Sequence, residues 1–177
     1  METKYIGETY VPAMTEPISP SSIPDSKGST NLLRSDDLYL FNEGSHVRLY
    51  EKLGAHFVKV EQTEGVNFGV WAPDAERVCV IGDFNGWRCD VNDLHPVKQS
   101  GIWEGFVAGA KQGQCYKFHI TSRYHRYNVE KADPYAFFSE VPPRTASVIW
   151  DLHYAWSDQA WMENRQKRNS HSQPISI

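Results

Sequence analysis

The stretch GVNFGVWAPDAERVCVIGDFNGW, residues 65–87, decides the fold of this chain. It holds two apolar runs, Val66 to Ala72 and Arg77 to Ile81, separated by turn-forming residues. Short runs bounded in this way are typical of β-strands. The stretch then continues into Asp83-Phe84-Asn85-Gly86, in which Asn and Gly tolerate the positive φ of a tight reversal. We therefore predict two consecutive strands and a turn that delivers Trp87 at its exit.

Strands and turns continue to alternate as far as residue 150. Three further strands are predicted: Ile102 to Val107, Cys115 to Thr121, and Ser147 to Trp150. In the second of these, Tyr116 and Phe118 alternate with Lys117, so the aromatic rings should enter a core and Lys117 should face solvent. Turn residues every 8 to 12 positions indicate a sandwich. We predict an all-β fold, an immunoglobulin-like antiparallel β-sandwich over residues 57–150.

The segments that flank this region differ in composition. Residues 1–34 carry Pro12, Pro17, Pro20 and Pro24 among small polar residues, which predicts a flexible N-terminal tail. Residues 35–56 predict a short helical lead-in, with Ser35 or Asp36 as the N-cap. Residues 151–177 turn polar and are predicted to be a linker that ends in an apolar, extended tetrapeptide at residues 174–177.

Length and charge exclude several classes of protein. A chain of 177 residues has room for about one domain. Its formal net charge of −4 provides no basic field for nucleic acid or anionic lipid, so we expect neither as a partner. The N-terminus lacks the pattern of a signal peptide, and no apolar run is long enough to span a membrane. We expect a cytoplasmic protein.

The residues that most often carry chemistry lie in uninformative positions. Cys79, Cys89 and Cys115 are odd in number and lack C-x-x-C spacing, which predicts reduced thiols and argues against a disulfide framework or a zinc site. His119 and His125 lack the i, i+4 spacing of a helical metal pair. We expect no metal and no cofactor.

Catalytic motifs are likewise missing from the sequence. Four aspartates stand in turn contexts, where a structural role is the simpler interpretation: Asp83, Asp90, Asp93 and Asp133. Glycoside chemistry needs two carboxylates held across one bond, and the sequence singles out no such pair. No nucleophile elbow, P-loop or dinucleotide motif occurs either. We therefore predict no catalytic residue.

Aromatic residues suggest a different use. The chain holds six Trp and nine Tyr. A sugar ring presents C–H groups on one face and hydroxyls at its rim, so its site needs an exposed indole with polar groups nearby. Trp87 beside Asn85, with an outward Lys117, fits that description. Two plainer interpretations stay open: Trp87 could anchor the core beneath its turn, and Lys117 could be a solvated surface lysine.

Several motifs in order resemble one known family. They are residues 65–87 above, LYLFNEG at 38–44, YEKLGAH at 50–56, GIWE at 101–104, YKF at 116–118, KADPYA at 131–136 and PPRTAS at 142–147. Together they resemble the N-terminal family 48 carbohydrate-binding module, in particular that of glycogen branching enzymes, from about residue 37 to residue 177. In that family the module precedes a glycoside hydrolase family 13 barrel, which cleaves α-1,4 links and forms α-1,6 branches.

The resemblance carries its own expectations. It implies a module that binds α-1,4-glucan (glycogen or a starch-like polymer) and braces the catalytic barrel of the same enzyme. It also implies that Pro174-Ile175-Ser176-Ile177 starts the first strand of that barrel, so that this chain would be inactive alone. The alternatives are a stand-alone glycogen-sensing or protein-interaction domain, against which the lead-in argues, and an enzyme in its own right.

The resemblance also implies a binding site. Related glycogen-sensing modules hold glucose units with the Trp of F-N-x-W and the Lys of Y-K-F, which correspond to Trp87 and Lys117. Those sensors carry a second stacking Trp shortly after the Y-K-F strand, and it is missing here. Tyr124 or Tyr127 is the candidate substitute. With Asn85, these residues form the predicted glucan-binding set.

Overall fold

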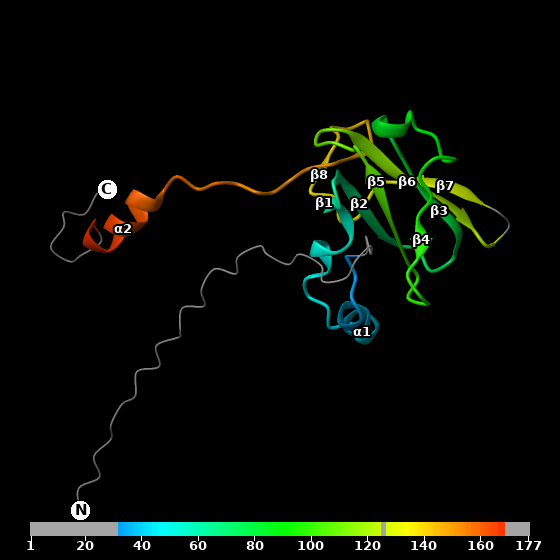
Figure 1. The fold of residues 1–177 in the computed structure, drawn as a ribbon, viewed down its shortest axis with the longest axis horizontal. Coiled ribbons are helices and arrows are strands. Elements are labelled where there is room, and N and C mark those ends of the chain that lie inside the picture. The colour runs from blue at the N-terminus through cyan, green and yellow to red at the C-terminus, as the bar shows by residue number, and fades with distance from the viewer. Residues whose placement is uncertain (1–31, 125–126, 169–177) are drawn as a thin grey trace, which may run out of the picture.

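Two antiparallel sheets face each other in the computed structural model, which describes residues 32–124 and 127–168 (Figure 1). The first sheet, sheet A, has the strand order β1 (Gly54–Val60), β2 (Thr63–Trp71), β5 (Ile102–Ala108), β4 (His95–Pro96). The second, sheet B, has the order β3 (Ala75–Gly82), β6 (Cys115–Ser122), β9 (Ser147–Val148), β8 (Phe138–Ser139), and β7 (Asn128–Lys131) also pairs with β6. This arrangement confirms the predicted all-β sandwich.

The core fills the space between the sheets. Alternate residues of β2, β3 and β6 point inward, and the largest fully buried rings are Tyr116, Phe68 and Phe118. The ring of Phe68 meets that of Tyr116 edge-on, with centroids 5.0 Å apart. The period-two pattern of β6 is as predicted, because Tyr116 and Phe118 are buried and Lys117 between them is half-exposed on the outer side. Residue parity therefore tells which face of sheet B each side chain occupies.

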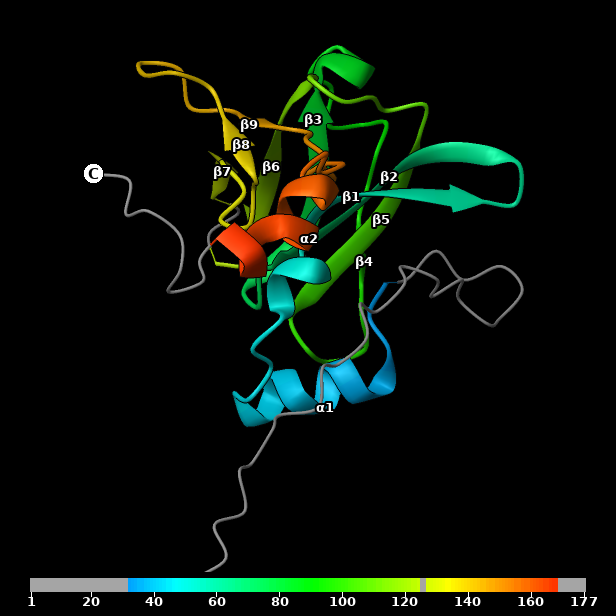
Figure 2. The same ribbon diagram turned by 90° about the vertical axis from the view of Figure 1, so that its left-hand side faces the viewer.

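A second cluster lies at one end of sheet A, on its outer face. Helix α1 (Ser35–Glu43) and the 3-10 helix η1 (Leu49–Glu51) bring side chains against the sheet there, as Figure 2 shows for α1 below the strands. The buried members are Leu33, Leu38, Leu53, Val97 and Ile102. The helix ends at Gly44, whose φ of 78° suits glycine. Leu33 comes from the segment expected to be a flexible tail, so the packed part of the chain already includes residues 32–34.

Helix α2 (Gln159–Arg168) follows an extended segment that leaves the sandwich after Trp150 (Figure 1). The sequence analysis predicted a linker in this region and no helix. The predicted barrel strand at residues 174–177 lies outside the described residues. In the part of the chain that the structure describes, no helix is both long enough and apolar enough to cross a membrane.

Candidate functional site

The turn that carries Trp87 has an unusual backbone. Strand β3 runs into the 3-10 helix η2 (Asp83–Asn85), and Gly86 and Trp87 then adopt left-handed conformations with φ of 64° and 61°. A left-handed conformation costs a non-glycine residue roughly 1–2 kcal/mol, so the surroundings must hold it. The Trp87 N–H donates to the Gly82 carbonyl at 2.9 Å. The Trp87 side chain is 41% exposed, which argues against its acting as a buried core anchor.

Asn85 holds this turn together through its side chain. Its Oδ1 accepts the Gly82 N–H at 3.0 Å, and its Nδ2 donates to the Val80 carbonyl and to Asn92 Oδ1, both at 2.9 Å. Both amide hydrogens are therefore committed inside the protein. Asn85 positions Trp87, and its Nδ2 has no hydrogen left to donate to a ligand.

Asp83 ties the indole to the neighbouring strand. One carboxylate oxygen accepts the Trp87 Nε1–H at 3.1 Å, and the other accepts the Cys115 N–H at 2.7 Å. Cys115 is the first residue of β6, so the indole sits beside the start of that strand. The predicted structural role of Asp83 agrees with these two bonds.

Lys117 lies two residues further along β6, on the outer face of sheet B. It pairs in register with Ile81, the residue before Gly82, to which Trp87 is bonded. Trp87 and Lys117 therefore belong to the same end of the β3–β6 pair. Within the described residues, no carboxylate lies at ion-pair distance from Lys117, so its ammonium is free to meet a polar ligand.

Tyr124 and Tyr127 are not brought to this end. Both are exposed, by 61% and 65%, in the connection between β6 and β7. From Lys117 to Ser122 the strand advances five residues, or about 17 Å at about 3.3 Å per residue. The two tyrosines are thus at the far end of β6 and do not share a sugar ring with Trp87.

An aromatic pair that the sequence analysis did not single out lies across sheet B. The rings of Phe138 and Trp150 are 5.1 Å apart at an interplanar angle of 36°. They line a hollow of about 530 Å³ together with the loop of residues 139–144. Trp150 is 38% exposed and Phe138 50%. The alternation of the predicted strand Ser147 to Trp150, which puts Val148 and Trp150 on one face, was the available signal.

The cysteine prediction is wrong in this structure. Cys79 and Cys89 form a disulfide with Cα atoms 5.6 Å apart, and only Cys115 is free. The chain turns back at η2, so that Cys79 forms a β-bridge with Asp93, and this return brings Cys89 to the strand. The Cys79–Cys89 disulfide closes the loop that carries Trp87. Burial, with nearby carboxylates, raises the pKa of the Cys115 thiol.

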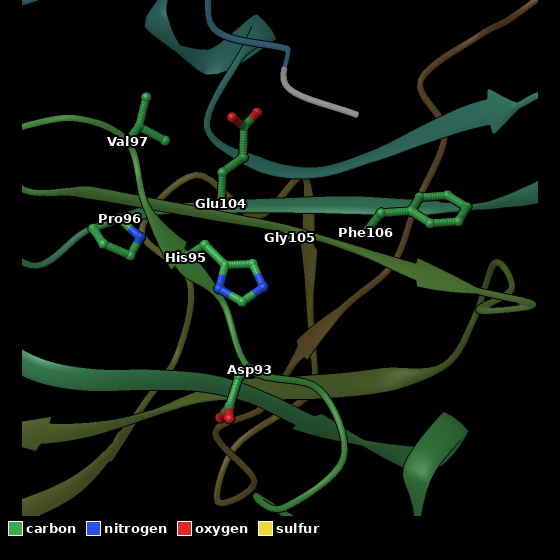
Figure 3. A pocket seen from close by; sticks show the side chains of 7 residues that line it. All are labelled: Asp93, His95, Pro96, Val97, Glu104, Gly105 and Phe106. Carbon is green, nitrogen blue, oxygen red and sulfur yellow. The ribbon is translucent and has the colours of Figure 1, made fainter. Parts of the chain in front are cut away.

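A smaller cavity of about 270 Å³ opens beside β4 and β5 (Figure 3). Its two carboxylates, Asp93 and Glu104, point in opposite directions in that view. Asp93 pairs with Arg77 at 2.8 Å, whereas buried Glu104 accepts the Asn67 Nδ2–H and the Leu32 N–H, both at 2.8 Å. These two acids are therefore not poised across one bond.

The remaining buried acid also has structural partners. The Asp133 carboxyl group accepts hydrogen bonds from the Tyr116 hydroxyl and from the Tyr135 N–H. Burial raises the pKa of Asp133, and burial together with Asp133 raises the pKa of Tyr116. The predicted structural role of Asp133 agrees with these bonds. Among the described residues, no group of three His, Cys, Asp or Glu side chains could hold a metal ion.

These features define a small β-sandwich module that carries exposed aromatic rings. Residues 52–136 match the family model described as carbohydrate-binding module 48 (isoamylase N-terminal domain). The chain thus carries a carbohydrate-binding module of family 48, as the resemblance implied.

Curated relatives extend the similarity beyond the module. The chain is 48% identical over 147 residues to the 1,4-alpha-glucan branching enzyme GlgB of Albidiferax ferrireducens, which covers 82% of this chain and 23% of that protein. It is 45% identical over 143 residues to GlgB of Francisella tularensis subsp. tularensis, covering 80% of this chain and 22% of that protein. The chain therefore spans less than a quarter of the length of these relatives.

A solved structure also matches part of the chain. The crystal structure of ligand-free PulA from Klebsiella pneumoniae aligns at a TM-score of 0.47 and 24% identity, over 59% of this chain and 10% of that one.

Proposed function

We propose that this chain is the α-glucan-binding and scaffolding N-terminal part of a 1,4-α-glucan branching enzyme, acting in glycogen biosynthesis. One observation carries the binding half: the exposed Trp87 indole is held by a clamped turn beside Lys117. The indole offers a flat face for the C–H side of a glucose unit, and the ammonium offers donors for its hydroxyls.

The scaffolding half rests on the comparison with longer relatives. The matching proteins are named as branching enzymes, and this chain covers only 22–24% of their length. We infer that cleavage of α-1,4 links and formation of α-1,6 branches belong to a catalytic barrel, the intramolecular partner of this module, and that the 177 residues alone are inactive. We also propose that the chain is divided into a lead-in at 35–56, a module at 57–150 and a connecting segment from 151, and that it is located in the cytoplasm.

Binding at Trp87 alone would be weak. Covering about 100 Å² of ring contributes about 2.5 kcal/mol at about 25 cal/mol per Å², whereas a millimolar complex needs about 4.1 kcal/mol. Lys117 must add to this, and a branched polymer adds multivalency. Glycogen should therefore bind better than any short oligosaccharide.

Co-sedimentation with glycogen tests the proposal. The chain is compared with Trp87→Ala and Lys117→Ala, with cellulose as the control polymer and circular dichroism as the check on folding. Glycogen-specific pelleting that is lost in both folded variants supports a glucan surface at this turn. Equal and negligible pelleting of all three proteins would refute it and favour a module that serves only as a structural or protein-interaction partner.

A further inference from the structure

We propose that Phe138 and Trp150 form a second stacking platform, which continues the glucan path from Trp87 across the outer face of sheet B. This inference rests on the proposed function, which it deepens by predicting that the site takes a chain of several glucose units. It concerns residues that belong to neither the F-N-x-W nor the Y-K-F motif.

The strand registers place Phe138 and Trp150 on the outer face of sheet B. Cys115 pairs with Val148, and Val148 pairs with Phe138. Directly opposed residues point to the same side of a sheet, and Cys115 lies on the side away from buried Tyr116. Phe138 therefore lies on the outer face, and alternation from Val148 brings Trp150 to the same side. The path from β3 to β8 crosses three strand spacings, or about 14 Å.

The start of β6 links the two ends of this path. The Cys115 N–H donates to Asp83, which also accepts the indole N–H of Trp87. On its other side, Cys115 is flanked by Val148 of β9. No described strand intervenes between the Trp87 turn and the Phe138–Trp150 pair except β6 and β9. Lys117 lies two residues further along β6, the strand that pairs with both β3 and β9.

The chemistry of the hollow suits a sugar better than a wholly apolar partner. The rings of Phe138 and Trp150 line it, and these side chains are 50% and 38% exposed. At its rim, Arg144 pairs with Glu140 at 3.6 Å, and the Arg144 side chain is 79% exposed. Rings supply contact with the C–H face of a glucose unit, and an exposed guanidinium beside a carboxylate supplies donors and acceptors for hydroxyls.

The platform is held firmly by the backbone around it. Ile149, just before Trp150, is fully buried, and its N–H and carbonyl bond to Gln114 and Gly113. The Glu140 N–H donates to the Ala146 carbonyl, and the Ala146 N–H donates to the Glu140 carboxylate. A ligand that stacks on Trp150 would therefore meet an ordered surface and would lose little affinity to ordering it.

Oligosaccharide length separates one platform from two. Titration calorimetry of the 177-residue chain uses maltotriose, which one platform accommodates, and maltoheptaose, which can span both. We expect Trp150→Ala to weaken maltoheptaose binding about tenfold, which is about 1.4 kcal/mol, and to leave maltotriose binding within about twofold. Trp87→Ala should weaken both sugars.

Trp156→Ala is the matched control. This Trp is 77% exposed but lies in the segment beyond the sandwich, against Tyr154. Its removal should change neither affinity. Phe138→Ala provides a second variant should Trp150→Ala fail to fold, and it should lower maltoheptaose affinity in the same direction.

Each outcome decides something. Maltoheptaose affinity unchanged in folded Trp150→Ala or Phe138→Ala overturns the second platform and leaves the proposed function standing on Trp87. A loss of the same size in Trp156→Ala overturns it as well, because the effect would then not be specific to this surface. If the wild-type chain binds neither sugar nor glycogen, the proposed function fails, and this inference with it.

Discussion

Replacing Cys89 by Ser tests how the Trp87 turn is held. The change removes the disulfide to Cys79, ten residues earlier. Closing a loop of about 11 residues restricts the unfolded chain enough to stabilise the fold by about 3 kcal/mol. The native contacts of the loop stay, because Asn85 still bonds Val80 and Asn92. The loss should therefore fall on the free energy of unfolding and leave the native fold intact.

Urea unfolding followed by Trp fluorescence measures the loss. With an m-value of about 2 kcal/mol/M, a loss of about 3 kcal/mol lowers the midpoint by about 1.5 M. Cys115→Ser is the control, because Cys115 is free and its removal should leave the midpoint nearly unchanged. Adding a reductant should lower the wild-type midpoint to that of Cys89→Ser and leave the variant where it was.

A thiol titration in denaturant gives the result that would refute this reasoning. Wild-type protein purified without reductant should show one thiol per chain, whereas three thiols, with equal midpoints for wild type and Cys89→Ser, would show that the loop is not closed covalently. Disulfides are rare in a reducing cytosol. A Cys79–Cys89 pair found oxidised in cells lysed with a thiol-blocking agent would therefore contradict the cytoplasmic location that we propose.

Three further predictions concern polar side chains with structural hydrogen bonds. Asn85→Ala removes three hydrogen bonds, so it should cost about 2 kcal/mol in thermal unfolding and reduce glycogen pelleting; unchanged pelleting would mean that the turn is held otherwise. Tyr116→Phe leaves buried Asp133 without its hydroxyl donor and should cost about 2 kcal/mol, measured by urea unfolding; a neutral result would place water there. Burial raises the pKa of the Glu104 carboxyl above its value in the unfolded chain, so the folded state holds the carboxyl proton more tightly. The contribution of Glu104 to stability is therefore fully present below the unfolded pKa and is lost as pH rises through the folded pKa. Glu104→Gln should therefore unfold at a higher midpoint than wild type at pH 8, with the gap closing towards pH 4; a gap that widens on acidification would contradict the sign.

Much of the sandwich could be predicted because its signal is local. The alternation in β6 predicted which side Lys117 occupies, and the turn residues after β3 predicted where Trp87 emerges. Strand β8, with two residues, is too short to show a period of its own and exists only because β9 supplies its partner. The local sequence around such an element determines neither the length of the strand nor the strand with which it pairs.

The parts that could not be predicted depend on contacts between distant residues. Cys79 meets Cys89 because the chain reverses at η2, and the spacing of the cysteines carries no trace of that. Phe138 meets Trp150 because β8 lies beside β9. The distance from Trp87 to Tyr124 follows from the length of β6. The predicted strand Cys115 to Thr121 covers nearly all of β6, so its length at about 3.3 Å per residue already places Tyr124 far from Trp87.

The two outer faces of the sandwich are used differently, and this limits where a glucan could lie. On sheet A, α1 and residues 32–33 pack over the end of the strands, and the Leu32 N–H is bonded to buried Glu104. A polymer would have to displace those contacts to reach that end of sheet A. On sheet B, Trp87 and the Phe138–Trp150 pair are exposed without any such covering among the described residues. Covering the exposed parts of these rings displaces no packed segment of the described chain, so binding energy is available on sheet B.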